Sequence, residues 1–263
     1  MEWLDIPYAS GSAAQQLDIY VPDAGEAPFP VLVRIHGGAF AFGDKRDAQF
    51  LPFLGGVERG YGVVSVNYRL SGEALFPAAV DDVKAAIHWL RANGARYRLD
   101  ASRIAVCSES AGGNLAATLW ATDKVQAAVD WFGPIDFSTM DEQRAANGLE
   151  PGDPGPGLGA GPEDSPEAQY LGAPIAEVPD LVRAADPTTY IHLGLPPILI
   201  QHGRVDPLVP VQQSIEFARA IGERAGADRY ELDILEGAGH GGPEFESEAN
   251  LGRVFAFLDR HLR

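Results

Sequence analysis

Short, mostly apolar segments alternate along the chain with segments of helical periodicity, and this alternation limits the fold more than any other feature. Seven segments are rich in β-forming residues: 17–21, 31–36, 63–67, 103–107, 127–132, 197–202 and 231–235. Several are apolar nearly throughout, which is typical of strands buried on both faces. Residues 77–93 and 247–262 carry apolar side chains at helical spacing. Strands separated by helices predict an α/β fold, with a mostly parallel sheet of about eight strands covered by helices on both faces.

Residues 137–191 interrupt this alternation, because they contain no clear strand pattern. Their central part, 150–166, is so dense in proline and glycine that it is not expected to form regular structure. The segment leaves the carboxyl end of a predicted strand, and ligands bind at that edge of an open α/β sheet. We therefore predict a single domain over residues 1–263, in which 137–191 form a lid or cap. A plain surface loop is the alternative.

The charge balance argues against several classes of partner. The chain has 37 acidic and 20 basic residues, a net charge of −17, which repels nucleic acids and anionic membranes. No uncharged apolar run reaches the roughly 18 residues of a membrane span. The first residues lack the basic and apolar regions of a secretory signal, so we expect a cytoplasmic protein unless a signal peptide has been removed. Cys107 is the single cysteine, and the histidines are scattered, so we expect neither a metal nor a cofactor.

Residues 103–117 run from a predicted strand through a turn of small residues into a helical pattern. The turn fits the nucleophile elbow, in which a serine followed two positions later by glycine is exposed above the sheet. Ser110 is the predicted nucleophile, with Gly112 as that glycine. Ser108 is the weaker candidate, because a serine stands two positions after it. A helix N-cap is the alternative role for Ser110.

A second loop, His36-Gly37-Gly38, follows the predicted strand 31–36. Attack of a serine on an ester creates an oxyanion that needs preorganised N–H donors. Two glycines after a strand let backbone amides face such a site. We expect Gly37 and Gly38, together with Ala111 beside the nucleophile, to form the oxyanion hole. His36 is expected to shape the loop and not to transfer protons.

Two further polar residues follow predicted strands. Asp206 lies after residues 197–202, and His240 lies in a glycine-rich loop after residues 231–235. Either alone would be ordinary turn chemistry. With Ser110 they follow the order Ser, Asp, His that serine hydrolases with a nucleophile elbow use. This order predicts a triad in which His240 is the base and Asp206 orients it.

On these motifs the chain resembles the α/β-hydrolase superfamily, and more closely the small esterases related to hormone-sensitive lipase, including bacterial feruloyl and acetyl-xylan esterase-like domains. The resemblance runs nearly end to end, through residues 17–22, 36–38, 43–45, 67–70, 76–78, 110–113, 165–167, 186–187, 202–206 and 239–241. It implies metal-free hydrolysis of a small-molecule carboxylic ester through an acyl-serine intermediate. A homodimer stays open.

Four aromatic residues near these motifs are candidates for the substrate pocket, with core packing as the alternative: Phe40, Phe42, Trp131 and Phe132. The predicted function is that of a serine carboxylesterase for short-chain or aryl esters. A formamidase or other amide hydrolase of the same fold is the nearest alternative. A non-catalytic binding protein of this fold is a second alternative, and it would be expected to have a damaged triad.

Overall fold

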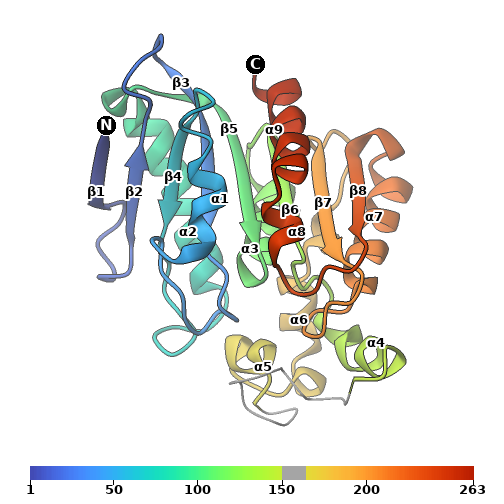
Figure 1. The fold of residues 1–263 in the computed structure, drawn as a ribbon. Coiled ribbons are helices and arrows are strands. Elements are labelled where there is room, and N and C mark those ends of the chain that lie inside the picture. Colours follow the sequence, from blue (N-terminus) through green and yellow to red (C-terminus); the bar gives the residue numbers. More distant parts are fainter. Residues whose placement is uncertain (150–163) are drawn as a thin grey trace.

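The computed structural model describes residues 1–149 and 164–263. Its centre is one eight-stranded sheet in the order β1-β2-β4-β3-β5-β6-β7-β8 (Figure 1). The strands are β1 (Glu2–Pro7), β2 (Gln16–Tyr20), β3 (Phe29–Ile35), β4 (Gly62–Val66), β5 (Leu99–Glu109), β6 (Ala127–Trp131), β7 (Ile198–Gly203) and β8 (Tyr230–Leu235). Strand β2 is antiparallel to both β1 and β4, and all other pairs are parallel. The predicted mostly parallel sheet is confirmed.

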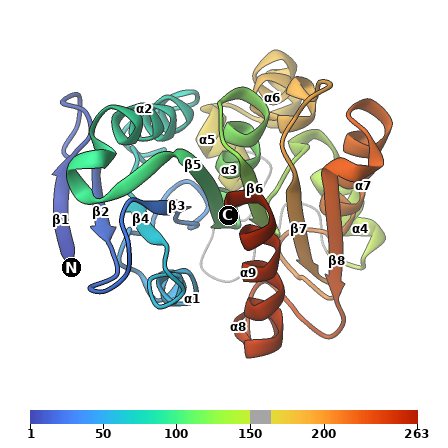
Figure 2. The same cartoon turned by 90° about the horizontal axis from the view of Figure 1, so that it is seen from above.

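Helices cover both faces of the sheet (Figure 2). The α-helices are α1 (Leu51–Leu54), α2 (Ala78–Asn93), α3 (Ala111–Thr122), α4 (Met140–Ala146), α5 (Pro166–Leu171), α6 (Pro179–Ala185), α7 (Gln212–Arg224), α8 (Pro243–Glu246) and α9 (Glu248–Leu262). Short 3-10 helices are η1 (Ala48–Phe50), η2 (Gly94–Tyr97), η3 (Phe137–Thr139), η4 (Ile175–Glu177), η5 (Pro187–Tyr190) and η6 (Ala227–Arg229). Among the residues that the structure describes, no helix combines the length and apolar character needed to cross a membrane.

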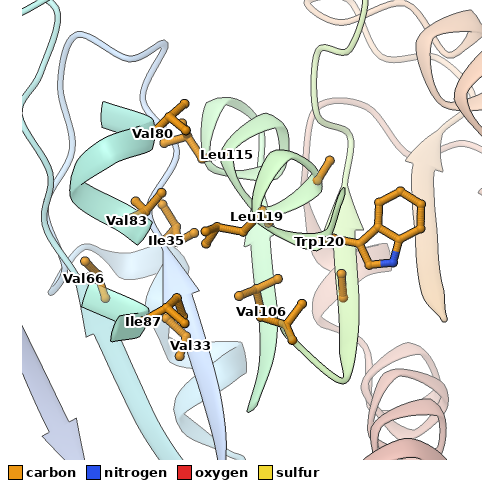
Figure 3. Close-up of a cluster of buried hydrophobic side chains, with 14 of the residues drawn as sticks. Val33, Ile35, Val66, Val80, Val83, Ile87, Val106, Leu115, Leu119 and Trp120 are labelled. Carbon is orange, nitrogen blue, oxygen red and sulfur yellow. The ribbon is translucent and has the colours of Figure 1, made fainter. Parts of the chain in front are cut away.

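The sheet separates two groups of buried side chains, because successive residues of a strand point to opposite faces. In β3, Val31, Val33 and Ile35 pack under α2 and α3, whereas Leu32 packs on the other face, toward α1 and α9. Figure 3 shows the first group, in which strand residues meet Val80, Val83 and Ile87 of α2 and Leu115, Leu119 and Trp120 of α3. This double burial is why the strand segments are almost wholly apolar.

Strand β1 is absent from the sequence prediction. It lies at the edge of the sheet, and most of its residues are exposed. Its register shifts between Trp3 and Ile6, where Asp5 has a φ of 54°. A polar, irregular edge strand has no apolar run by which it could be recognised.

The described part of the 137–191 segment contains α4, α5 and α6 with short 3-10 helices, and no strand. These helices lie beyond the carboxyl ends of the parallel strands (Figure 1). Most of the stretch predicted to be irregular, 150–166, lies outside the described residues. Its last residues differ from the prediction, because Pro166 begins α5 and Ser165 caps this helix by accepting a hydrogen bond from the Ala168 N–H at 3.1 Å. Proline suits the first helical position, where no N–H is needed.

Candidate active site

Ser110 forms the sharp turn between β5 and α3. Its φ of 55° and ψ of −128° are unusual for a residue with a side chain. The Ser110 hydroxyl makes no capping hydrogen bond to α3, so the N-cap alternative does not describe it. The glycine at Gly112 is required, because a Cβ there would lie 2.2 Å from the Ile35 carbonyl oxygen. Ser108 replaces the usual glycine without strain, since its Oγ accepts the Ile35 N–H at 3.0 Å.

His240 joins Ser110 to Asp206 through two hydrogen bonds. The Ser110 Oγ lies 2.9 Å from His240 Nε2, and His240 Nδ1 lies 2.8 Å from Asp206 Oδ2. The three residues follow β5, β7 and β8, whose carboxyl ends meet at one edge of the sheet. The structure thus brings together three side chains that are far apart in the sequence.

Asp206 is buried and held by four donors. Its Oδ1 accepts the N–H groups of Leu208 and Val209 at 2.8 and 2.9 Å, and its Oδ2 faces His240 and His202. Burial alone would raise the pKa of Asp206, but hydrogen bonds from His202 and His240 outweigh it and hold this pKa well below its ordinary value. The carboxylate is therefore ionised and fixed in orientation.

The structure corrects one predicted oxyanion donor. The Gly37 N–H donates to Glu109 Oε1 at 3.0 Å, so it is engaged away from the serine. Gly38, Ala39 and Ala111 instead line the cavity beside Ser110. At Gly38 the φ is 102°, and an added Cβ would lie 2.1 Å from the Phe42 carbonyl oxygen. Sequence reasoning did not place Ala39 in the cavity wall, because its φ of 54° is set by the course of the loop and not by residue type.

Glu109 connects the serine turn to this loop. It is buried, and it forms an ion pair with Arg34, which precedes the loop on β3 and also contacts Asp47 at 2.8 Å. Burial raises the pKa of Glu109 to about 7, although Arg34 opposes the shift. The carboxylate accepts from both Arg34 and Gly37, so Glu109 sets the course of the glycine loop next to Ser110.

A cavity of about 200 Å³ opens over Ser110 and His240. Its remaining wall comes mainly from the loop after β3, from Leu208 and Val209, and from the 137–191 segment, together with Gln49 and Pro134. From that segment Arg144 and Glu167 contribute charged groups, and burial raises the pKa of Glu167. Sequence reasoning missed both residues, because nothing in their local pattern links them to Ser110.

The four predicted pocket aromatics divide into two pairs. Phe40 and Phe42 line the cavity, Phe40 stacked on Tyr170 with ring centroids 4.0 Å apart. Trp131 and Phe132 are not among its lining residues, which corrects the prediction for them. Trp131 is buried on the α1 and α9 side of the sheet. The Phe132 ring packs against the His240 ring, with centroids 4.6 Å apart, and so supports the imidazole. Trp131 ends β6, and Phe132 is the first residue after this strand.

Within residues 1–149 and 164–263, no three His, Cys, Asp or Glu side chains gather as metal ligands would.

The chain is similar to several known esterases. The sequence model of the BD-FAE family matches residues 17–221. "Esterase LipQ" of Mycobacterium tuberculosis is 33% identical over 252 residues, which make up 90% of this chain and 56% of LipQ. A solved "Bifunctional GH43-CE" of Bacteroides eggerthii superposes with a TM-score of 0.86 at 33% identity, over 100% of this chain and 35% of that one. Est2 of Thermogutta terrifontis, solved with butyrate bound, superposes with a TM-score of 0.72 at 25% identity, over 96% and 92% of the two chains.

These similarities differ in what they cover. The chain spans about half the length of the curated relatives it matches. The family match, in contrast, begins in β2, ends in α7 and includes the serine turn and the loop after β3. The chain therefore has the α/β-hydrolase fold and belongs to the BD-FAE family.

Proposed function

We propose that the chain is a serine carboxylesterase that hydrolyses short-chain or aryl carboxylic esters. The observation that carries the proposal is the unbroken hydrogen-bond chain from Ser110 through His240 to Asp206, with distances of 2.9 and 2.8 Å. The names of the relatives support ester hydrolysis, since LipQ is an esterase and Est2 was solved with butyrate bound. An intact triad also disfavours the non-catalytic alternative.

The proposed reaction proceeds by acyl transfer. His240 takes the Ser110 proton at Nε2 as Oγ attacks the ester carbonyl carbon, and the ionised Asp206 stabilises the imidazolium that forms. The N–H groups of Gly38, Ala39 and Ala111 receive the oxyanion. His240 then protonates the departing alcohol, which leaves an acyl-serine. Water attacks this ester by the same route and releases the carboxylic acid.

The size of the cavity favours a substrate with a compact acyl group. Its volume of about 200 Å³ lies below the roughly 300–1,000 Å³ typical of sites for drug-sized ligands. Phe40 and Phe42 offer an apolar wall that would suit a short aliphatic chain or an aromatic ring. We also propose that 137–191 act as a cap on a single domain, because Met140, Arg144 and Glu167 form one side of the cavity. A cytoplasmic location stays a prediction, and a homodimer stays open.

Hydrolysis of a p-nitrophenyl ester series from acetate to palmitate, with one aryl ester and one anilide amide, tests the proposal. We expect the highest kcat/KM for short or aryl acyl groups and a loss of about 10⁴-fold or more in Ser110→Ala. Ser108→Ala is the matched control, because this neighbouring serine bonds to the backbone of β3 and not to His240.

Three results would contradict the proposal. Activity that survives in Ser110→Ala would mean a different nucleophile. Turnover of the anilide alone would favour the amide hydrolase. Absence of turnover on every substrate would favour a binding protein.

A further inference from the structure

A second histidine faces the acid of the triad. His202 lies near the end of β7, fully buried, and its Nε2 is 3.4 Å from Asp206 Oδ2. The same oxygen accepts the hydrogen bond from His240 Nδ1 at 2.8 Å. One carboxylate oxygen therefore lies between two imidazole rings, and the esterase mechanism uses only one of them.

Hydrogen-bond partners determine the tautomer of His202. Its Nε2 also lies 2.9 Å from the Val209 carbonyl oxygen, so both neighbours of this nitrogen are acceptors and it must carry a proton. On the other side of the ring, Nδ1 lies 2.7 Å from Ser214 Oγ, on α7. A serine hydroxyl donates to an unprotonated ring nitrogen. The arrangement fits a neutral imidazole whose N–H points between Val209 and Asp206.

The contacts form a closed ring around the carboxylate. Val209 accepts from His202 through its carbonyl oxygen and donates through its N–H to Asp206 Oδ1 at 2.9 Å. Without His202, the one donor left to Oδ2 among the described residues would be His240, in a buried site. The ionisable groups that face His202 are Asp206, on the loop after β7, and Asp130 on β6, which is also buried.

A neutral hydrogen-bond donor next to Asp206 Oδ2 has a specific advantage for the reaction. During acyl transfer His240 becomes positively charged, and Asp206 must keep its charge directed at Nδ1. A second cation on the other side of Asp206 would compete with the imidazolium for that charge. A neutral N–H orients the carboxylate without such competition.

We propose that His202, hydrogen-bonded at Nδ1 to Ser214, is a positioning residue that holds Asp206 in the orientation required by His240. This inference rests on the proposed triad. Substituting His202→Phe keeps a ring of similar shape and removes both nitrogens, whereas His202→Gln keeps an N–H donor near the position of Nε2. Ser214→Ala leaves the imidazole and removes the hydroxyl that donates to Nδ1.

Steady-state kinetics on p-nitrophenyl acetate and one-dimensional ¹H NMR of the same proteins test the inference. We expect His202→Phe to lower kcat about 10- to 100-fold with KM changed less than about 3-fold. His202→Gln should recover most of this loss, and Ser214→Ala should fall between wild type and His202→Phe. The low-field resonance of the proton between His240 and Asp206 should persist in wild type and His202→Gln, and be lost or broadened in His202→Phe.

Folded variants, verified by circular dichroism, distinguish the outcomes. Wild-type kcat and an unchanged low-field resonance in His202→Phe would overturn the inference, as would a folded His202→Gln no better than His202→Phe. If His202→Phe does not fold, Ser214→Ala decides, and wild-type values in this variant would overturn it. If wild type hydrolyses no ester, the proposed function fails, and the low-field resonance alone decides on His202.

Discussion

The buried carboxylates of Asp130 and Glu109 lie next to the serine turn. One oxygen of each has no hydrogen-bond partner among the described residues. Asp130 Oδ1 accepts the Gly133 N–H at 3.1 Å, and its Oδ2 has no hydrogen-bond partner among the described residues. Burial raises the pKa of Asp130 to about 6, and the hydrogen bond from the Gly133 N–H only partly opposes this. An ionised Asp130 is therefore costly, and the turn beneath Ser110 is a place where pH and stability are linked.

Asp130→Asn should expose this linkage. Between the ordinary pKa of 3.8 and about 6, folded wild type binds more protons than the unfolded chain, so its stability falls as pH rises through this window. The amide does not titrate. The free energy of unfolding of Asp130→Asn minus that of wild type should rise by up to about 3 kcal/mol from pH 4 to pH 7 in urea titrations. Asp123→Asn removes a carboxylate of lowered pKa, whose linkage to stability lies below pH 4, so its difference from wild type should stay nearly constant from pH 4 to pH 7. A difference in unfolding free energy between Asp130→Asn and wild type that does not change with pH would contradict this linkage.

The buried ion pair of Arg34 and Glu109 allows a second prediction. Glu109→Gln keeps an oxygen for the Gly37 N–H but removes the charge that faces the fully buried Arg34. We expect a loss of up to about 3 kcal/mol at pH 8, because the buried guanidinium loses its buried partner and keeps the partly exposed Asp47. Adding Arg34→Met should restore more than half of it. Chemical denaturation of both single variants and the double variant measures the coupling, and additive losses would contradict a direct interaction.

At the scale of elements, the approach of α3 to β3 decides whether the serine turn can form. A Cβ at Gly112 would meet the backbone of Ile35, which cannot move aside as a flexible side chain can. We expect Gly112→Ala to destabilise the protein by about 3 kcal/mol in thermal or urea unfolding. Gly252→Ala is the matched control, because this glycine of α9 has no neighbouring atom within 4 Å of an added Cβ. It should stabilise the protein by roughly 0.5–1 kcal/mol. Equal changes in stability for Gly112→Ala and Gly252→Ala would mean that helix propensity, and not the close approach of α3 to β3, determines the effect at Gly112.

For the whole molecule, the net charge of −17 produces self-repulsion that salt screens. Raising NaCl from about 0.02 to about 0.5 M should stabilise the protein at pH 8 by about 1 kcal/mol, or roughly 2–4 °C in Tm for a chain of this size. The gain should shrink at pH 5, where protonation of carboxylates lowers the net charge. Calorimetry at both pH values measures it, and a lower Tm in salt at pH 8 would mean that attractive ion pairs outweigh the repulsion.

Local sequence patterns predict those features of the protein that depend on local interactions. Burial on both faces makes the inner strands apolar, and the edge strand β8 still carries Leu232, Ile234 and Leu235, so seven of the eight strands can be read from the sequence. Strand β1 is missed because it is an exposed and irregular edge. The nearness of Ser110, Asp206 and His240 also follows from the sequence, because each stands at the carboxyl end of a strand and those ends meet at one edge.

Contacts between distant residues were decided only in the tertiary structure. The Gly37 N–H turns to Glu109, 72 residues away, and Trp131 and Phe132 are buried beside the cavity without lining it. His202 reaches Asp206, and the helices of 137–191 bring Arg144 and Glu167 to the cavity. Residue type and periodicity determine which face of an element is buried. The direction of a single N–H or ring depends on backbone angles and on neighbours supplied by other elements, so no local pattern records it.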